Sequence, residues 1–207
     1  MPDYQLEKQA LADGYRCICG IDEAGRGPWA GPVVAAAVVL DTQLISPELL
    51  VQLDDSKKLS ASKRQDIYEQ LGDCAQFAVG WASVAEIDEI NILQATFLAM
   101  RRAVEALSVA VDLALIDGNK TPGLSCAERA IVKGDAKSYS ISAASIIAKI
   151  SRDREMRELS ARYPGYGWER NAGYGTREHQ QALAKLGVTP AHRQSYAPIR
   201  KILGQTG

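Results

Sequence analysis

The sequence predicts an α/β protein in which a mixed β-sheet is covered by helices. Short apolar segments typical of strands alternate with longer segments of helical periodicity along the 207 residues. The segment 33–40 is continuously apolar, as expected for a strand covered on both faces. No repeat, low-complexity stretch or Gly/Ser-rich linker divides the chain, so we expect a single domain spanning residues 1–207.

Five segments have the length and apolar character of strands. Three of them end at acidic residues: the first ends in Asp22 and Glu23, the fourth in Asp117, and the fifth just before Asp135. In α/β sheets, functional sites collect beyond the carboxyl ends of strands, so these positions are the candidates for a site. In chain order the predicted strands are residues 17–21, 33–40, 76–81, 111–116 and 130–132.

Helices are predicted in three places. Ser60 or Ser62 can cap a helix that runs to about residue 71, and Ser83 with Glu86 has the form of a capping box. A helix from residue 140 to about 162 is rich in Ser and Ala, whose small side chains permit a close backbone approach. The helix after Ser83 carries apolar residues at steps of four and three, which we assign to the core. They are Leu93, Phe97, Met100, Val104 and Leu107.

The bulk composition leaves the function open. Twenty-four basic and 25 acidic residues give a formal net charge of −1, unlike a protein that binds nucleic acid by net charge alone. A local basic patch can nevertheless coexist with an acidic metal site. Four cysteines without zinc spacing and only two histidines argue against a Cys/His metal site and against a disulfide framework.

The N-terminal 15 residues are polar, so no secretory signal is expected. The longest apolar run is far too short to span a bilayer. We therefore expect a soluble, cytoplasmic protein with no membrane partner.

The strand-end carboxylates are the strongest functional signal. Several carboxylates that converge would repel one another and raise at least one pKa unless a cation lies between them. Oxygen ligands without nearby His or Cys suit hard cations, so Asp22, Glu23, Asp117 and Asp135 predict a site for Mg²⁺ or Mn²⁺. Such acidic clusters support two-metal hydrolysis of phosphodiesters.

This prediction carries a geometric condition. Adjacent residues in a strand point to opposite faces, so Asp22 and Glu23 can serve one site only if the strand ends or twists there. The Ala24-Gly25 pair that follows them is consistent with such a break.

The glycine-rich segment from Gly25 to Ala30 supports two hypotheses. It formally satisfies the dinucleotide fingerprint, which would suggest a nicotinamide- or flavin-binding oxidoreductase. Against this, Pro28 and Pro32 fall where a helix should open, and the next segment resembles a strand. The alternative is that glycines let the backbone approach a sugar-phosphate chain, with Arg26 placed for a phosphate or stacking contact.

The motifs of this chain resemble those of the ribonuclease HII family, the type 2 RNases H. The matching blocks occur in the same order and cover roughly residues 17–200. They are Asp22-Glu23-Ala24-Gly25-Arg26-Gly27-Pro28, Asp55-Ser56-Lys57-Lys58-Leu59-Ser60, Glu89-Ile90-Asn91-Ile92-Leu93, Leu115-Ile116-Asp117-Gly118-Asn119, Val132-Lys133-Gly134-Asp135, Ser142-Ala143-Ala144-Ser145-Ile146, Ala148-Lys149 and Gly173-Tyr174-Gly175-Thr176.

The resemblance implies an RNase H-like fold, with a helical C-terminal segment of about residues 160–207 that completes the substrate cleft. It also implies endonucleolytic cleavage of RNA in RNA–DNA hybrids, or 5′ to single ribonucleotides in duplex DNA, leaving 3′-hydroxyl and 5′-phosphate ends. A monomer is expected from the family. The four carboxylates named above would be the catalytic metal ligands.

The resemblance also assigns roles in substrate binding. The backbone of Gly25, Arg26 and Gly27 would contact the ribose 2′-hydroxyl, the group that distinguishes RNA from DNA. Tyr174 would pack on the sugar at the RNA-to-DNA junction, and the lysine pair Lys57 and Lys58 would contact phosphates without recognising sequence.

The chain departs from the family pattern at one place. Asn171-Ala172 stands where many relatives have a His-Lys pair, so phosphate contacts there would be weaker or supplied by Arg170 or Arg177. His179 and His192 are equally compatible with the surface and with function.

Two further sets of residues have simple structural interpretations. Asp153 is interpreted as an ion-pair partner on a helix surface. The serines at 140, 142 and 145 are interpreted as caps and packing residues rather than as part of the site.

Overall fold

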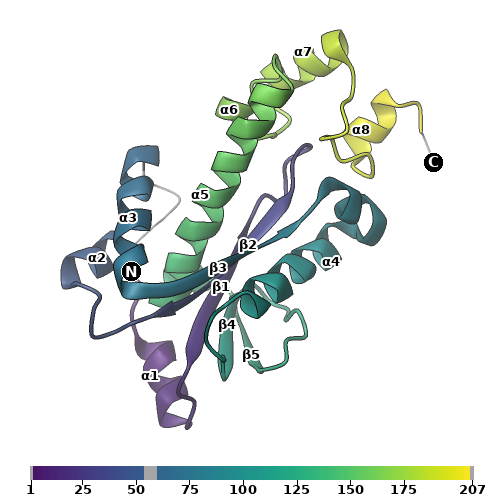
Figure 1. Cartoon of the computed structure of the whole chain (residues 1–207). Coiled ribbons are helices and arrows are strands. Elements are labelled where there is room, and N and C mark those ends of the chain that lie inside the picture. Colours follow the sequence, from purple (N-terminus) through teal and green to yellow (C-terminus); the bar gives the residue numbers. More distant parts are fainter. Residues whose placement is uncertain (1, 54–59, 206–207) are drawn as a thin grey trace.

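The computed structural model describes residues 2–53 and 60–205, and within them the strands form one mixed sheet in the order β3-β2-β1-β4-β5 (Figure 1). The β2–β3 and β1–β2 pairs are antiparallel, whereas the β1–β4 and β4–β5 pairs are parallel. The mixed sheet predicted from the sequence is therefore confirmed. The strands are β1 (Ile18–Ala24), β2 (Val33–Leu40), β3 (Ala75–Ala82), β4 (Leu113–Asp117) and β5 (Ala127–Ile131).

Helices cover both faces of this sheet (Figure 1). The two long ones, α4 and α5, lie on opposite faces, and each packs on the central strands. In chain order the helices are α1 (Gln5–Ala12), α2 (Pro47–Gln52), α3 (Ala61–Cys74), α4 (Val84–Glu105), the short 3-10 helix η1 (Gly134–Ala136), α5 (Tyr139–Arg162), α6 (Trp168–Asn171), α7 (Arg177–Leu186) and α8 (Ala197–Ile202).

Strand β2 shows why the sheet needs a helix on each face. Its side chains alternate between two cores: Ala36 and Val38 pack with α3 and α5, whereas Ala35 and Ala37 pack with α4. All four are buried, as expected for a continuously apolar strand. The segment thus cannot be solvated on either side.

Helix α5 lies unusually close to β1. A Cβ atom added at Gly20 would come within 2.1 Å of the Ser140 carbonyl carbon and 2.3 Å of the Ile141 amide nitrogen. Ser138 caps the helix by accepting a hydrogen bond from Ile141 N, and the buried Ser140 and Ser142 donate to the Glu7 carboxylate and the Leu53 carbonyl. The prediction that the small side chains of this helix allow close backbone contact is confirmed.

Helix α4 approaches the sheet in the same way, which changes the predicted core. A Cβ at Gly80 would lie 2.0 Å from the Ala99 carbonyl oxygen, so only small side chains fit at the interface. The most deeply buried face therefore contains alanines. Of the predicted stripe, Met100 is fully buried, and Leu93, Phe97 and Val104 are half-buried. Leu107 is also half-buried but lies beyond the end of α4.

The first strand and the glycine-rich segment differ from two expectations. β1 does not end at Asp22-Glu23 but continues to Ala24, because its edge with β2 remains paired there. The glycine-rich segment leads into antiparallel β2 rather than into a helix. The dinucleotide-binding hypothesis is therefore wrong, since no helix N-terminus follows the glycines to receive a pyrophosphate.

The C-terminal part forms its own apolar cluster at the far end of α5 (Figure 1). Trp168 is fully buried at its centre and stacks on Tyr166. The cluster also contains Ala30, from the segment before β2, so the C-terminal helices are fixed to the beginning of the chain. The cluster lies beside the glycine-rich segment and therefore supports that segment at the site.

Both histidines lie inside this C-terminal cluster, which corrects the view that they could equally be surface residues. His179 and His192 are fully buried, and their Nε2 atoms are 3.0 Å apart. Burial and the neighbouring His179 lower the pKa of His192 to about 4, and burial also lowers the pKa of His179. The two rings are therefore neutral at physiological pH.

All four cysteines lie in the described part of the chain and are free thiols, in agreement with the absence of a predicted disulfide framework. Among the described helices, none combines the length and the apolar character required to cross a membrane.

We predict that Gly20→Ala lowers the free energy of unfolding by at least about 3 kcal/mol, because the added methyl group meets rigid backbone of α5. The matched control is Gly72→Ala in α3, where a Cβ meets nothing within 4 Å. That change should stabilise the protein by up to about 1 kcal/mol through helix propensity. Urea denaturation of both variants measures this, and equal effects would refute the proposed close contact.

We also predict that the contribution of His192 to stability falls as the pH decreases from 7 to 5. The unfolded chain protonates His192 below about pH 6.5, whereas the folded state resists protonation until about pH 4. Acid therefore favours the unfolded state in this window, by about 2 kcal/mol at pH 5.

The control for this pH effect is His192→Gln, which removes the titrating ring. Asp22 and Glu23 have raised pKa values and titrate in the opposite sense, but they are present in both proteins. The difference between wild type and variant in unfolding free energy, measured in urea at pH 5, 6 and 7, should thus shrink as the pH falls. A constant difference would show that His192 has the same pKa in the folded and the unfolded protein, which would contradict the effect of burial.

Candidate active site

The register of the sheet brings two distant carboxylates together. The last residue pair between parallel β1 and β4 is Ile21–Ile116, so Asp22 and Asp117 come next at the carboxyl end of both strands. Beyond this point β1 is paired only with β2, which leaves the edge beside Asp22 open. The structure thus brings these two predicted acidic residues together where the pairing of β1 with β4 ends.

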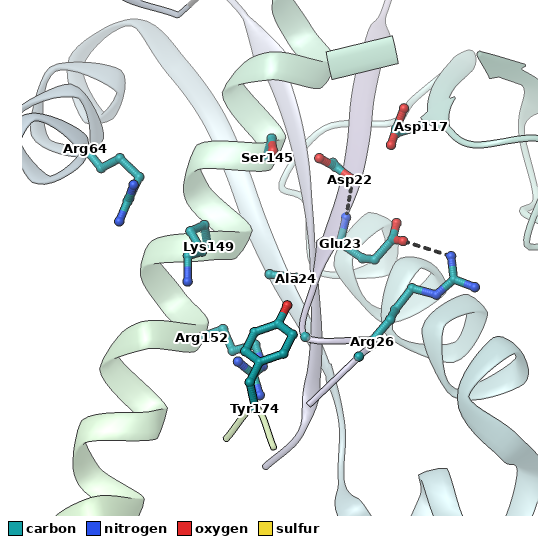
Figure 2. Close-up of a pocket in the computed structure, with 12 residues that line it drawn as sticks. Asp22, Glu23, Ala24, Arg26, Arg64, Asp117, Ser145, Lys149, Arg152 and Tyr174 are labelled. Atoms are coloured by element: carbon teal, nitrogen blue, oxygen red, sulfur yellow. Dashed lines mark hydrogen bonds and ion pairs between the residues drawn. The ribbon is translucent and has the colours of Figure 1, made fainter. Parts of the chain in front are cut away.

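A pocket of about 440 Å³ opens at this edge (Figure 2). Its acidic end contains Asp22, Glu23 and Asp117, and its basic end contains Lys149 and Arg152. Both adjacent residues of β1 therefore face one cavity, even though the strand does not end between them. The remaining lining residues are Ala24, Gly25, Arg26, Gly27, Arg64, Ser145 and Tyr174.

The acidic end is electrostatically strained. Burial raises the pKa of Asp22 well above its ordinary value, and the charges of Glu23 and Asp117 raise it further. Hydrogen bonds from the Ser145 hydroxyl and from the Glu23 amide, the latter at 2.7 Å, only partly offset this. The carboxylates thus lack sufficient positive charge among their own neighbours to ionise together at low cost.

Glu23 lies between two cavities. Burial raises its pKa, while Arg26, whose guanidinium is 3.2 Å from the Glu23 carboxylate, opposes that shift. Glu23, Arg26 and Asp117 also line a second pocket of about 210 Å³ on the α4 side, together with Leu93 and Phe97. These three charged residues therefore line both pockets and lie at the boundary between them.

Asp135 is less directly placed. It lies in η1 and is half-buried, and the amide of the preceding Gly134 donates a 2.6 Å hydrogen bond to the Asp117 carboxylate. This bond ties the turn to the site, but Asp135 is not among the residues that line the main pocket. Across residues 2–53 and 60–205, no group of three His, Cys, Asp or Glu side chains lies close enough together to bind a metal ion without rearrangement.

The all-oxygen character of the site nevertheless fits a divalent cation. Asp22, Glu23 and Asp117 supply carboxylate oxygens only, with a hydroxyl from Ser145 beside them. Hard cations such as Mg²⁺ and Mn²⁺ prefer these donors, and such a cation would neutralise the repulsion that raises the pKa of Asp22.

The glycine-rich loop is held from beneath by two buried arginines. Arg193 donates hydrogen bonds to the carbonyl oxygens of Gly25, at 2.5 Å, and Arg26, at 2.9 Å. Arg152 donates to the carbonyls of Ala30, Pro32 and Ala172, and it lies so close to Gly25 that a Cβ there would be 1.9 Å from its Nε. Gly25 also has φ +96°, a backbone conformation that favours glycine. Both this φ angle and the lack of space for a Cβ therefore require glycine at this position.

Tyr174 lies at the mouth of the pocket. Its side chain is half-exposed, and its ring edge is 3.3 Å from where a Cβ of Gly27 would be. Tyr174 and the loop are therefore neighbours, as the predicted roles in binding one nucleotide junction require.

The basic end of the pocket was missed by the sequence analysis. Ser145, Lys149 and Arg152 recur on α5 at steps of four and three, which places them on one helix face. The same spacing is present in the sequence and is the signal that indicates Lys149 and Arg152. The interpretation of Ser145 as a packing residue alone is therefore incomplete. Arg64 from α3 completes the group.

Other residues with predicted roles are placed as follows. Lys57 and Lys58 lie outside the described residues. Arg170 forms ion pairs with Glu169 and Glu178, which offset its charge locally, whereas Arg177 is exposed. Asp153 pairs with Lys149 at 2.6 Å, which confirms its interpretation as an ion-pair residue.

The Asn171-Ala172 departure has a structural role. The Asn171 side chain donates to the Tyr166 carbonyl and accepts from the Gly173 amide, so it shapes the backbone directly before Tyr174.

Known proteins share both this sequence and this architecture. The family model described as Ribonuclease HII matches residues 19–199. Ribonuclease HII from Ruegeria pomeroyi is 58% identical over 99% of this chain and 86% of its own length, and that from Rhodospirillum rubrum is 57% identical over 100% and 94%. The crystal structure of ribonuclease H2 from Pyrococcus horikoshii has a TM-score of 0.77 at 29% identity, over 92% of this chain and 98% of that one.

These similarities confirm the predicted RNase H-like fold and the resemblance on which it was based. The chain belongs to the ribonuclease HII family, whose members are endoribonucleases that act on RNA paired with DNA.

Proposed function

We propose that this enzyme cuts the RNA strand of RNA–DNA hybrids and also cuts 5′ to single ribonucleotides embedded in duplex DNA, leaving 3′-hydroxyl and 5′-phosphate ends. One observation carries the proposal: a single pocket has three crowded carboxylates at one end and a cluster of cations at the other. This polarity suits a phosphodiester, whose charge the cations can bind while the reacting group lies near the carboxylates.

The acidic end would hold the catalytic ions. Asp22, Glu23 and Asp117 would ligate Mg²⁺ or Mn²⁺, with Asp135 joining them from its turn beside Asp117. When bound, a pair of such ions supplies activation of water and stabilisation of the leaving oxygen. The contribution of the chain is to hold the carboxylates in fixed places, through the Ser145 hydroxyl on Asp22 and the Gly134 amide on Asp117.

The basic end would bind the phosphates that flank the reacting one. Lys149 and Arg152 project from one face of α5, and Arg64 faces them from α3. Arg152 is 1% exposed and its guanidinium donates to backbone carbonyls, so it would add a fixed positive charge beneath the pocket, while direct phosphate contacts would come from Lys149 and Arg64. Such contacts orient the duplex without recognising its sequence.

Selection of the ribonucleotide would take place at the glycine-rich loop. Gly25, Arg26 and Gly27 present backbone that can come close to a ribose, because the glycines have no side chain there. Tyr174 would pack on the sugar that follows, since its half-exposed ring adjoins Gly27 at the pocket mouth. This arrangement would detect a 2′-hydroxyl next to a deoxyribose and so support removal of ribonucleotides from DNA.

We predict that Asp117→Asn abolishes cleavage, a loss of at least about a thousandfold, because the variant lacks a charged metal ligand. Folding should persist, since the amide oxygen of Asn can still accept the Gly134 hydrogen bond. Mn²⁺ should raise the thermal midpoint of the wild type by relieving carboxylate repulsion, and raise that of the variant less.

The matched control is Asp112→Asn. Asp112 directly precedes β4 at the opposite end from Asp117, and its carboxylate caps the backbone amides of Arg16 and Cys17. Turnover should stay near the wild-type value in this variant. Near-normal cleavage by Asp117→Asn, or equal losses in the two variants, would contradict the assignment of the strand-end carboxylates.

We further predict that a DNA duplex with one ribonucleotide is cut in Mg²⁺ or Mn²⁺, whereas the same duplex made only of DNA is not. The expected difference follows from close contact between the Gly25–Gly27 backbone and the 2′-hydroxyl. Cleavage of labelled duplexes, with and without chelator, measures it. Comparable cleavage of both duplexes would remove the 2′-hydroxyl from the mechanism.

A further inference from the structure

The buried histidine pair has a hydrogen-bond direction that its neighbours determine. The backbone amide of Thr189 can only donate, and it lies 2.9 Å from His192 Nδ1. His192 Nδ1 is therefore the acceptor nitrogen, and the proton of this neutral ring is on Nε2. That proton faces His179 Nε2 at 3.0 Å.

The same argument assigns the tautomer of His179. The Trp168 indole N–H, which can only donate, also points at His179 Nε2, at 3.2 Å. This nitrogen accepts both contacts, so the His179 proton is on Nδ1, which lies 2.9 Å from the carbonyl oxygen of Tyr174. The chain of donors thus runs in one direction, from Thr189 through His192 and His179 to the backbone of Tyr174.

The end point of this chain is a residue at the pocket mouth. The Tyr174 carbonyl accepts from His179 and from the Thr176 amide, while its own amide donates to Asn171. On either side, the Trp29 amide donates to the Gly173 carbonyl, and a Cβ at Gly175 would come within 2.2 Å of the Trp29 indole. The backbone of Tyr174 is therefore fixed from behind by buried groups while its ring remains half-exposed.

We propose that His179 is a positioning residue for Tyr174, and that His192 holds His179 in the tautomer that this role requires. The inference rests on the proposed function, because it takes Tyr174 as the residue that packs on the sugar at the RNA-to-DNA junction. His179 does not touch the substrate. It orients the tyrosine backbone, so the pair sets how strongly the enzyme favours a single embedded ribonucleotide.

Both rings must be neutral for this chain to exist. A second proton on either ring would place N–H groups against each other at the Nε2–Nε2 contact or at the Thr189 amide. The surrounding side chains are mainly aromatic, from Tyr166 and Trp168, and Glu178 is the charged group that acts on His179. The cluster thus favours two uncharged rings over an imidazolium.

A double-mutant cycle tests the positioning role. His179→Phe keeps an aromatic ring but removes the donor, and His179→Asn retains an N–H near the Nδ1 position. We expect His179→Phe to lower kcat/KM on a duplex with one ribonucleotide about tenfold when Tyr174 is present, and less than about twofold in the Tyr174→Ala background. His179→Asn should restore most of the loss, and a uniform RNA–DNA hybrid should be affected less.

The control variant is Tyr166→Phe, which removes a hydrogen bond to the Gly187 carbonyl in the same cluster without touching the chain of donors. It should leave the preference between the two substrates unchanged. If His179→Phe lowers kcat/KM by the same factor with and without Tyr174, the positioning role is overturned.

A second measurement depends neither on activity nor on the folding of a variant. In the wild-type protein at pH 7, ¹⁵N NMR of the imidazoles should show His179 protonated at Nδ1 and His192 at Nε2. The opposite tautomers, or a charged ring, would overturn the inference. This result stands even if no substrate with an embedded ribonucleotide is cut, so failure of the proposed function and failure of the histidine chain can be told apart.

Discussion

The close contact between β1 and α5 at Gly20 determines the rest of the site. From there the strand and the helix run along each other: Ser145 meets Asp22, and Arg152 meets Gly25. The five residue steps from Gly20 to Gly25 span about 17 Å as a strand, and the twelve from Ser140 to Arg152 span about 18 Å as a helix. The strand and the helix therefore advance by nearly equal lengths. One face of α5 can therefore serve the carboxylates and the glycine-rich loop together.

The buried arginines give the loop its rigidity by an unusual means. Arg152 and Arg193 are fully buried, and their described hydrogen bonds are to backbone carbonyls and to the hydroxyl of Tyr196 rather than to carboxylates. Burial lowers the pKa of both groups, to about 10 for Arg152, so Arg152 is charged at neutral pH, as a guanidinium ordinarily is in proteins. Positive charge is thus placed under a loop that would meet a polyanion, and next to a strained acidic cluster.

Local patterns in the sequence were sufficient for the approximate positions of the strands, for the mixed sheet and for Asp117 at the end of its strand, but not for the continuation of β1 past Asp22 to Ala24. They failed where partners come from far along the chain. The histidines could not be assigned to the interior, because their burial depends on contacts between residues 168 and 192. The role of Arg152 depends on carbonyls more than 100 residues before it. Strand patterns and small residues can be recognised within a short stretch of sequence. The hydrogen-bond partners of a buried polar group cannot, because they come from distant segments.

The sequence separation between Arg193 and the loop that it supports has a consequence for folding. Its guanidinium donates to the carbonyls of Gly25 and Arg26, which lie 168 and 167 residues earlier in the chain. All five strands of the sheet precede Arg193, so strand pairing does not by itself complete this loop. A polypeptide truncated before Arg193 would therefore carry the acidic cluster without this support beneath the ribose-contacting backbone.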